Sequence, residues 1–248
     1  MMSDEVLVGD GPRGLSELER VVDTFVAPAQ TFRDILRSAS WWLPFVLLMV
    51  SSVSTAFVVD KKVGFDQVFD NQLRMSQKAQ DRMADLSPEQ KAQTVKMQVT
   101  VTKYITYCSF AMIAIFMAIY ALILWASFNF GLGASTKFSQ VFAVTMYAGL
   151  PYLLTALLTI LALSFGGNAE GYDYKNPVGT NLGYFLPDAA PWLRGLLSCF
   201  DVVKLWSVVL QVIGMAIVAK KTIAQSAMVV GFFWLIGVVV TVLGAAFS

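Results

Sequence analysis

The sequence predicts an all-α, polytopic membrane protein with five transmembrane helices, an extramembrane helical hairpin and two interfacial amphipathic helices. Of its 248 residues, 56% are hydrophobic and 14% are charged, whereas a soluble domain has about a quarter charged residues. The mean hydropathy is +0.63, and the apolar residues gather in long windows. Two adjacent tryptophans, Trp41 and Trp42, stand where an amphipathic stretch runs into the first window.

Composition argues against several kinds of function. The net charge is +1 and there is no basic tract, so nucleic acid is not an expected partner. The chain has no histidine, the commonest general base and metal ligand, and its two cysteines, Cys108 and Cys199, lie in or beside apolar windows. We therefore expect no catalytic, cofactor-binding or metal-binding residues and no enzyme activity. The first dozen residues do not have the pattern of a signal peptide.

Residues 1–40 predict a tail with two short helices. Ser16 and Glu19 match a capping box at the start of the first helix, whose apolar stripe would be Leu18, Val21, Val22 and Phe25. The second helix begins near Thr31, and its short, strongly amphipathic pattern is typical of a helix that lies on a membrane surface. The interfacial anchors expected in this region are Phe32, Trp41 and Trp42.

Residues 41–248 predict a membrane domain that crosses the bilayer five times. About 20 residues are needed to cross a hydrocarbon core roughly 30 Å thick. The expected spans are residues 41–59, 104–130, 141–165, 202–218 and 225–247. Gly149 and Pro151 should kink the third span. The fourth span is the least regular, because Asp201 and Lys204 intrude at its start.

Residues 60–103 lack membrane character and predict the helical hairpin. A first amphipathic helix is indicated by the spacing of Phe65, Val68, Phe69 and Leu73. A second helix should start at Ser87, with Pro88 in its first turn and Gln90 closing a capping box. No breaker follows before Phe130, so we expect one continuous helix of roughly 65 Å. The hairpin is either a solvated spacer or a docking surface.

The loop of residues 166–201 predicts the second interfacial helix. Its first half is rich in turn residues. Asp188 can then cap a helix whose apolar face is formed by Leu193, Leu196, Leu197 and Phe200, with Trp192 as an interfacial anchor.

Three stretches resemble the bacterial branch of the Yip1 domain family: FVAPAQTFRDIL near the start, NPVGTNLGYFL in the loop, and DVVKLWSVVLQVIGMAIVAKK at the fourth window. The second stretch opens with Asn176 and Pro177, and the spacing from Asp201 to Trp206 is the most specific feature of the third. The resemblance extends from about Val22 to the C-terminus. It implies a five-span protein of a bacterial cytoplasmic membrane with its N-terminus in the cytosol.

Two features of the sequence depart from the family pattern. Eukaryotic members are associated with vesicle traffic and bind Rab-type GTPases, but this sequence lacks their YGP-type segment before the first span. That partner is therefore not transferred to this chain. Lys204 also stands where the family pattern has a small or polar residue.

Polar residues in or near the spans are the remaining candidate sites. Asp201 and Lys204 are three residues apart and can pair, or Asp201 can favour the helix N-terminus while Lys204 extends to the interface. Gln211, in mid-span, should form a hydrogen bond to another helix. Small residues four apart mark packing faces, which serve either within one subunit or in a homo-oligomer: Gly214 and Val218, and Gly237, Thr241 and Ala245.

The positive charges near the membrane disagree with the family resemblance on orientation. With the N-terminus inside, the cytosolic side holds Arg33, Arg37, Lys137, Lys220 and Lys221. The opposite side holds more Lys and Arg, so the positive-inside rule alone favours the reverse orientation. The resemblance, the lack of a signal-peptide pattern and the lysine pair in the shortest loop favour a cytosolic N-terminus, which we expect.

Two functions agree with the sequence. The first is a non-catalytic membrane scaffold or adaptor that acts through the hairpin and the interfacial helices on lipid or on a protein partner of unknown identity. The alternative is a small transporter, or the accessory subunit of a transport complex, with a polar path near Asn129, Asp201, Lys204 and Gln211.

Overall fold

The computed structural model describes residues 14–166 and 169–247, and within them the chain forms α-helices joined by short turns. The acidic first dozen residues lie outside this part of the chain. Two short elements of other types occur, a π-helical turn η1 and a 3₁₀ turn η2. In chain order the elements are α1 (Glu17–Val26), α2 (Pro28–Arg37), α3 (Trp42–Lys62), α4 (Phe65–Arg74), α5 (Gln77–Ala84), α6 (Pro88–Tyr107), α7 (Ser109–Ala126), η1 (Ser127–Gly131), α8 (Phe138–Ala148), α9 (Tyr152–Ser164), η2 (Leu182–Phe185), α10 (Pro191–Cys199), α11 (Val202–Val218) and α12 (Ile223–Ala246).

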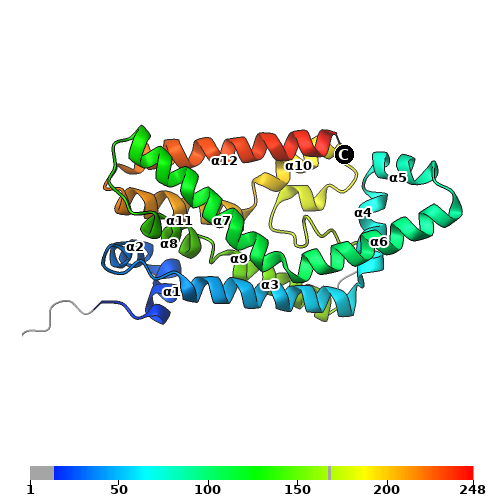
Figure 1. Cartoon of the computed structure of the whole chain (residues 1–248), viewed down its shortest axis with the longest axis horizontal. Helices are drawn as coiled ribbons and strands as arrows, with labels where there is room; N and C mark the ends of the chain where they lie inside the picture. Colours follow the sequence, from blue (N-terminus) through cyan, green and yellow to red (C-terminus); the bar gives the residue numbers. More distant parts are fainter. Residues whose placement is uncertain (1–13, 167–168, 248) are drawn as a thin grey trace, which may run out of the picture.

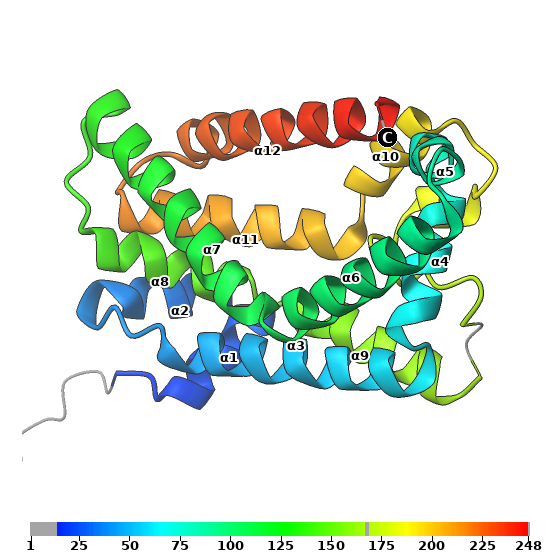
Figure 2. The same ribbon diagram turned by 45° about the vertical axis from the view of Figure 1, so that its right-hand side comes forward.

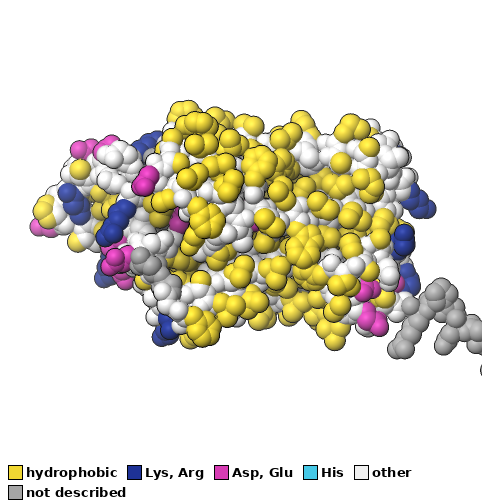
Figure 3. Space-filling model, turned by 180° about the vertical axis from the view of Figure 1, so that it is seen from behind, with side chains coloured by type: hydrophobic (Ala, Val, Ile, Leu, Met, Phe, Trp, Pro, Cys, Tyr) yellow, Lys and Arg dark blue, Asp and Glu magenta, His cyan; other side chains and the backbone are white. Residues whose placement is uncertain are grey.

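Helices α3, α11 and α12 run along roughly one direction, and α7 crosses them obliquely (Figure 1). Among the described residues, four segments are long and apolar enough to cross a membrane: Trp42–Lys62, Ser109–Gly131, Phe138–Ser164 and Ile223–Ala246. A fifth is obtained if α10 and α11, which meet at an angle of 46°, are counted as one broken span. The space-filling view shows a broad apolar band with charged side chains gathered at its two ends (Figure 3). This distribution is that of an integral membrane protein.

The predicted continuous helix from Ser87 to Phe130 is wrong, because the chain turns at Cys108 between α6 and α7. Figure 2 shows the two helices meeting at an angle beside α3. The Ser109 hydroxyl donates to the Thr106 carbonyl at 2.7 Å and also contacts the Ser52 hydroxyl of α3 at 2.7 Å. A serine that bonds a nearby carbonyl competes with the helical ladder, and such bonds commonly bend helices.

The expected hairpin contains three helices, α4, α5 and α6. Helix α4 packs against α6 as predicted, and it buries Phe65 and Val68 in a small cluster with Val59 of α3. Helix α5 has no buried residue. We refer to α4, α5 and α6 up to Lys103 as the arm. Figure 1 places most of the arm at the end of the bundle opposite α1 and α2.

Helix α2 is part of the protein core, and the apolar face that was expected to meet lipid packs against other helices. Phe32 and Ile35 are fully buried, and α2 packs against α8 and α11. Phe32 is therefore not an interfacial anchor, because protein covers its ring where lipid was expected. Trp41, Trp42 and Trp192 keep exposed rings. Their role as anchors at the headgroup level remains a prediction.

Helix α10 packs along α12, so the predicted second interfacial helix is held by another helix. A Cβ atom at Gly195 would lie 3.0 Å from the Ala245 Cβ and 3.6 Å from the Thr241 carbonyl oxygen. Thr241 and Ala245 thus form a packing face within the subunit, whereas an added Cβ at Gly237 would meet nothing within 4 Å. Asp188 does not cap α10, which has no side-chain cap and starts with Pro191.

Gly214 allows three helices to meet at the buried side of α2. A Cβ atom there would lie 2.5 Å from Val144 Cγ1 of α8 and 3.0 Å from the ring of Phe32. Both neighbours are fully buried. This contact requires a residue without a side chain.

We expect Gly214→Ala to destabilise the protein by about 1–3 kcal/mol, the usual cost of overpacking a filled core. The matched control is Gly231→Ala in α12, where the added Cβ meets nothing within 4 Å. Alanine is favoured over glycine in helices by about 1 kcal/mol, so the control should be neutral or stabilising. Thermal unfolding in detergent measures both variants, and equal Tm values would contradict the packing described above.

Candidate functional site

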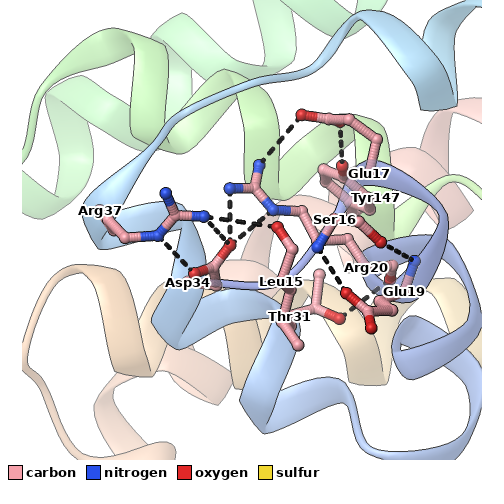
Figure 4. A network of polar contacts seen from close by, with 9 residues as sticks. All are labelled: Leu15, Ser16, Glu17, Glu19, Arg20, Thr31, Asp34, Arg37 and Tyr147. Carbon is pink, nitrogen blue, oxygen red and sulfur yellow. Dashed lines mark hydrogen bonds and ion pairs between the residues drawn. The ribbon is translucent and has the colours of Figure 1, made fainter. Parts of the chain in front are cut away.

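A polar network at the N-terminal end of the bundle surrounds Arg20 (Figure 4). Arg20 is only 1% exposed, and its Nε and Nη2 atoms lie 2.7 and 2.6 Å from Asp34 Oδ2. Arg37 approaches the other carboxylate oxygen, with Nε 2.8 Å from Asp34 Oδ1. Arg20 Nη1 has no hydrogen-bond partner and lies 3.7 Å from Glu17 Oε1. Glu17 in turn accepts a hydrogen bond from the Tyr147 hydroxyl of α8 at 3.1 Å.

The carboxylate of Asp34 remains ionised in this network. Burial would raise its pKa, but hydrogen bonds from Arg37 and Arg20 and their positive charges outweigh burial and lower the pKa of Asp34 below its ordinary value of 3.8. The network therefore joins α1, α2 and α8 through charged groups.

The sequence did not predict this network, because α1 turns Arg20 and Thr24 inward beside only two residues of its predicted apolar stripe, Val21 and Phe25. The buried residues of α1 are Arg20 and Thr24, while Leu18 and Val26 are 71% and 74% exposed. The Thr24 and Thr31 hydroxyls both donate to the Arg20 carbonyl, at 2.7 and 3.0 Å. The four-residue spacing of Arg20 and Thr24 places both side chains on one face of α1, and this was the available signal. It indicates a buried polar contact only once Asp34 of α2 is known to lie opposite that face.

A second polar cluster, the loop junction, connects the 176–183 loop to the start of α11. Asp201 Oδ1 caps α11 by accepting from the backbone N–H groups of Val203 and Lys204 at 2.9 and 3.1 Å. Asp201 Oδ2 accepts from the Thr180 hydroxyl and, at 3.1 Å, from Asn181 Nδ2. One carboxylate thus holds both a helix terminus and a loop.

The loop side of the junction is made by amide side chains. Asn176 and Asn181 exchange hydrogen bonds, at 3.2 Å from Asn176 Nδ2 and 2.8 Å from Asn181 Nδ2. Asn176 Nδ2 also donates to the Ser198 hydroxyl of α10 at 3.4 Å. The backbone N–H of Val202 donates to the Thr180 carbonyl at 3.1 Å. These bonds join α10, α11 and the loop at the end of the bundle where the arm begins.

Asp201 and Lys204 do not form the ion pair considered from the sequence. The Lys204 Nζ atom donates to the Ser198 carbonyl at 3.0 Å, while Asp201 acts as a helix cap, the second of the two predicted roles. Pro177, together with Asn176, Thr180, Asp201 and Lys204, lines a recess of about 80 Å³. The structure therefore brings four of the predicted site residues together: Asn176, Pro177, Asp201 and Lys204.

The other predicted polar residues lie apart from the loop junction. Trp206 packs edge to face on Phe25 of α1, with ring centroids 5.5 Å apart. Gln211 donates to the Thr145 hydroxyl of α8 at 3.5 Å, which is the predicted bond between helices. Asn129 closes the turn between α7 and α8 by bonding the backbone of Thr136. The polar path considered for a transporter is thus divided, since Asn129 does not line the pockets that contain Lys204.

The described residues offer no metal site: no group of three or more Cys, Asp or Glu side chains gathers among them in a way that could hold an ion. Ionisable residues in both polar clusters are instead engaged with backbone groups, amides or one another. These contacts can hold helices and a loop in place. Lys204 lines two neighbouring pockets.

A comparison with protein families places this arrangement in context. The model of the Yip1 domain matches residues 22–244, which include α2, the loop junction and all the apolar helices. The match begins within α1, beyond Arg20. No curated protein and no solved structure matches the chain.

We expect Asp201→Ala to lower the free energy of unfolding by about 2 kcal/mol, because loss of an N-cap costs about 1 kcal/mol and the donors of Thr180 and Asn181 lose their acceptor. The matched control is Asp188→Ala, which removes an exposed aspartate of the same loop. Thermal unfolding and limited proteolysis of the 169–190 segment measure the effect. If both variants unfolded and were cleaved like the wild type, Asp201 would not hold the loop.

Proposed function

Because the chain belongs to the Yip1 domain family, we propose that this integral membrane protein is a non-catalytic scaffold or adaptor that docks a protein partner through its arm. The observation that carries the proposal is the arm itself, a helical projection whose surface is mostly uncovered. Helix α5 buries no residue and α6 buries only Thr106, which lies beyond the arm.

The surface of the arm has the mixed character of a docking site for a protein. It carries exposed charges of both signs on α5 and at the start of α6: Lys78, Asp81, Arg82, Asp85 and Glu89. Closer to the bilayer, Met97 and Val101 are exposed on α6. Exposed apolar residues rimmed by polar ones are typical of interaction sites.

The arm is also held in a fixed direction. At its base, Lys103 forms an ion pair with Asp60 of α3, with Nζ 3.1 Å from Oδ2, and Tyr107 donates to the same oxygen at 3.0 Å. Asn71 of α4 donates to the carbonyls of Ala169 and Tyr172 at 2.9 and 3.0 Å. A surface that is already ordered loses less entropy on binding, which supports docking over a flexible spacer.

The alternative of a small transporter or an accessory subunit of a transport complex retains one supporting observation. Lys204 and Gln211 line the same pocket. Asn129, the third predicted member of a polar path, lies in the turn between α7 and α8. We favour the scaffold because the arm offers a larger and more continuous feature.

Reversing the charges of Asp81, Arg82 and Asp85, which all face solvent on the arm, should reduce recovery of the partner at least tenfold. The matched control reverses three exposed charges at the other end of the molecule: Arg33, Lys137 and Lys220. Affinity capture of the full chain in mild detergent, quantified by mass spectrometry, compares both with the wild type. An unchanged set of captured proteins would contradict the adaptor. Solute flux in liposomes that Lys204→Gln abolishes would favour the transporter.

We further propose that the protein resides in a bacterial cytoplasmic membrane with its N-terminus in the cytosol, which places the arm on the opposite side. Support comes from the family resemblance and from the lysine pair Lys220 and Lys221 in the short turn between α11 and α12. The arm would then meet a partner outside the cytosol.

Cysteine labelling tests this orientation. In a chain with Cys108 and Cys199 replaced by serine, Ser87→Cys on the arm should react with an impermeant maleimide in intact spheroplasts. Ser135→Cys, exposed at the opposite end of the bundle, should react only after the membrane is opened. The reverse pattern would invert the orientation, and equal labelling of both sites in intact spheroplasts would contradict the five-span path.

A further inference from the structure

A pocket lies among the apolar helices, between α7, α9, α10, α11 and α12. Its volume is about 350 Å³, near the lower end of the range for small-molecule sites. It is lined by Tyr120, Tyr152, Cys199, Lys204, Ser207, Val208, Gln211, Phe233, Trp234, Gly237, Val238 and Thr241. Neither the scaffold role nor the loop junction accounts for it.

The lining of this pocket is mostly polar on α11 and mostly apolar on α12, and its one charge lies at the end near the loop. On α11 the lining residues run from Lys204 at the end near the loop to Gln211 in mid-helix, a distance of about 10 Å at 1.5 Å per residue. Lys204 is the only charged residue of the lining. The facing wall, on α12, is largely apolar and includes Phe233, Trp234 and Val238. A ligand with a charged end near the loop and an apolar body would match this order.

The charge of Lys204 lacks a counterion in contact. Its Nζ atom donates to the Ser198 carbonyl, and among the described residues no carboxylate oxygen lies within 4.0 Å of it. The nearby carboxylate of Asp201 is occupied by the cap of α11 and by the loop. A cation at the edge of a membrane core is stabilised by an anionic partner, and Lys204 also borders the polar recess of about 80 Å³.

Two residues that line the pocket on α12, Gly237 and Thr241, are exposed at the surface of the protein. An added Cβ at Gly237 would meet nothing within 4 Å. A molecule from the surrounding bilayer can therefore enter beside this glycine without displacing a side chain.

We propose that this pocket binds one anionic phospholipid of the bilayer, with an acyl chain between α11 and α12 and the phosphate at Lys204. The loop end of the pocket supplies the charge, and the apolar walls of α12 cover the chain. Lys204 is a ligand-binding residue in this assignment, and Gly237 keeps the entrance open. The site would give the membrane protein a preference for anionic lipid that its net charge of +1 does not supply.

Native mass spectrometry of the delipidated full chain in mild detergent tests the headgroup assignment. The probes are dioleoyl phosphatidylglycerol and dioleoyl phosphatidylcholine at equal concentration, with oleate in a separate arm. The wild type should prefer phosphatidylglycerol, and Lys204→Gln should reduce that preference about fivefold, as expected for one lysine near an anionic headgroup. Lys204→Arg keeps the charge and should retain the preference for phosphatidylglycerol. Lys62→Gln, at the end of α3, should also retain this preference.

A second pair of variants tests where the acyl chain of the lipid lies. Gly237→Phe fills the entrance and should reduce binding of phosphatidylglycerol, while Gly231→Phe, also in open space on α12 but outside the pocket, should not. The proposal is overturned if Lys204→Gln behaves like Lys62→Gln, or if the two phenylalanine variants bind lipid equally. Stronger binding of oleate than of phosphatidylglycerol would also overturn it, in favour of a free fatty acid.

Discussion

The burial of Arg20 against Asp34 determines how the N-terminal end of the molecule is built. A buried guanidinium is costly unless its charge is paired, and Asp34 Oδ2 lies 2.6 Å from Arg20 Nη2 to supply the opposite charge. The pair connects α1 to α2, and α2 then inserts Phe32 between α8 and α11 at Gly214. The outward turn of Leu18 and Val26 follows from the same contact, because the polar side of α1 faces inward.

The loop junction has the corresponding role at the other end. Asp201 is both the cap of α11 and the acceptor for Thr180 and Asn181. Two stretches that resemble the Yip1 domain family, one in the loop and one at α11, are therefore in direct contact through Thr180 and Asp201, which are 21 residues apart in the chain. Lys204 lies next to this contact and lines the pocket. Asp201 of the family-like stretch and the lysine proposed to bind lipid therefore lie within one turn at the start of α11.

The sequence predicted features that depend on neighbouring residues and missed those that depend on distant ones. The all-helical fold, the apolar spans and the capping boxes at Ser16 and Ser87 agree with the structure, because caps and periodicity are local. The turn at Cys108 has no breaker in the sequence and arises where Ser109 meets Ser52 of α3. Phe32 was misplaced because an amphipathic pattern shows that a face is apolar and does not show whether lipid or protein covers it. Arg20 was missed for the same reason, since its partner lies on another helix.

The turn at Cys108 gives α6 a direction of its own, fixed at its base by the bonds of Asp60 and Ser52. Helix α6 is about 30 Å long at 1.5 Å per residue, so its far end lies well to the side of the line of α7 (Figure 2). From there the arm reaches the end of α12, where Lys78 Nζ donates to the Phe247 carbonyl at 3.4 Å. An uninterrupted helix from Ser87 to Phe130 would instead have carried the arm away along the axis of α7.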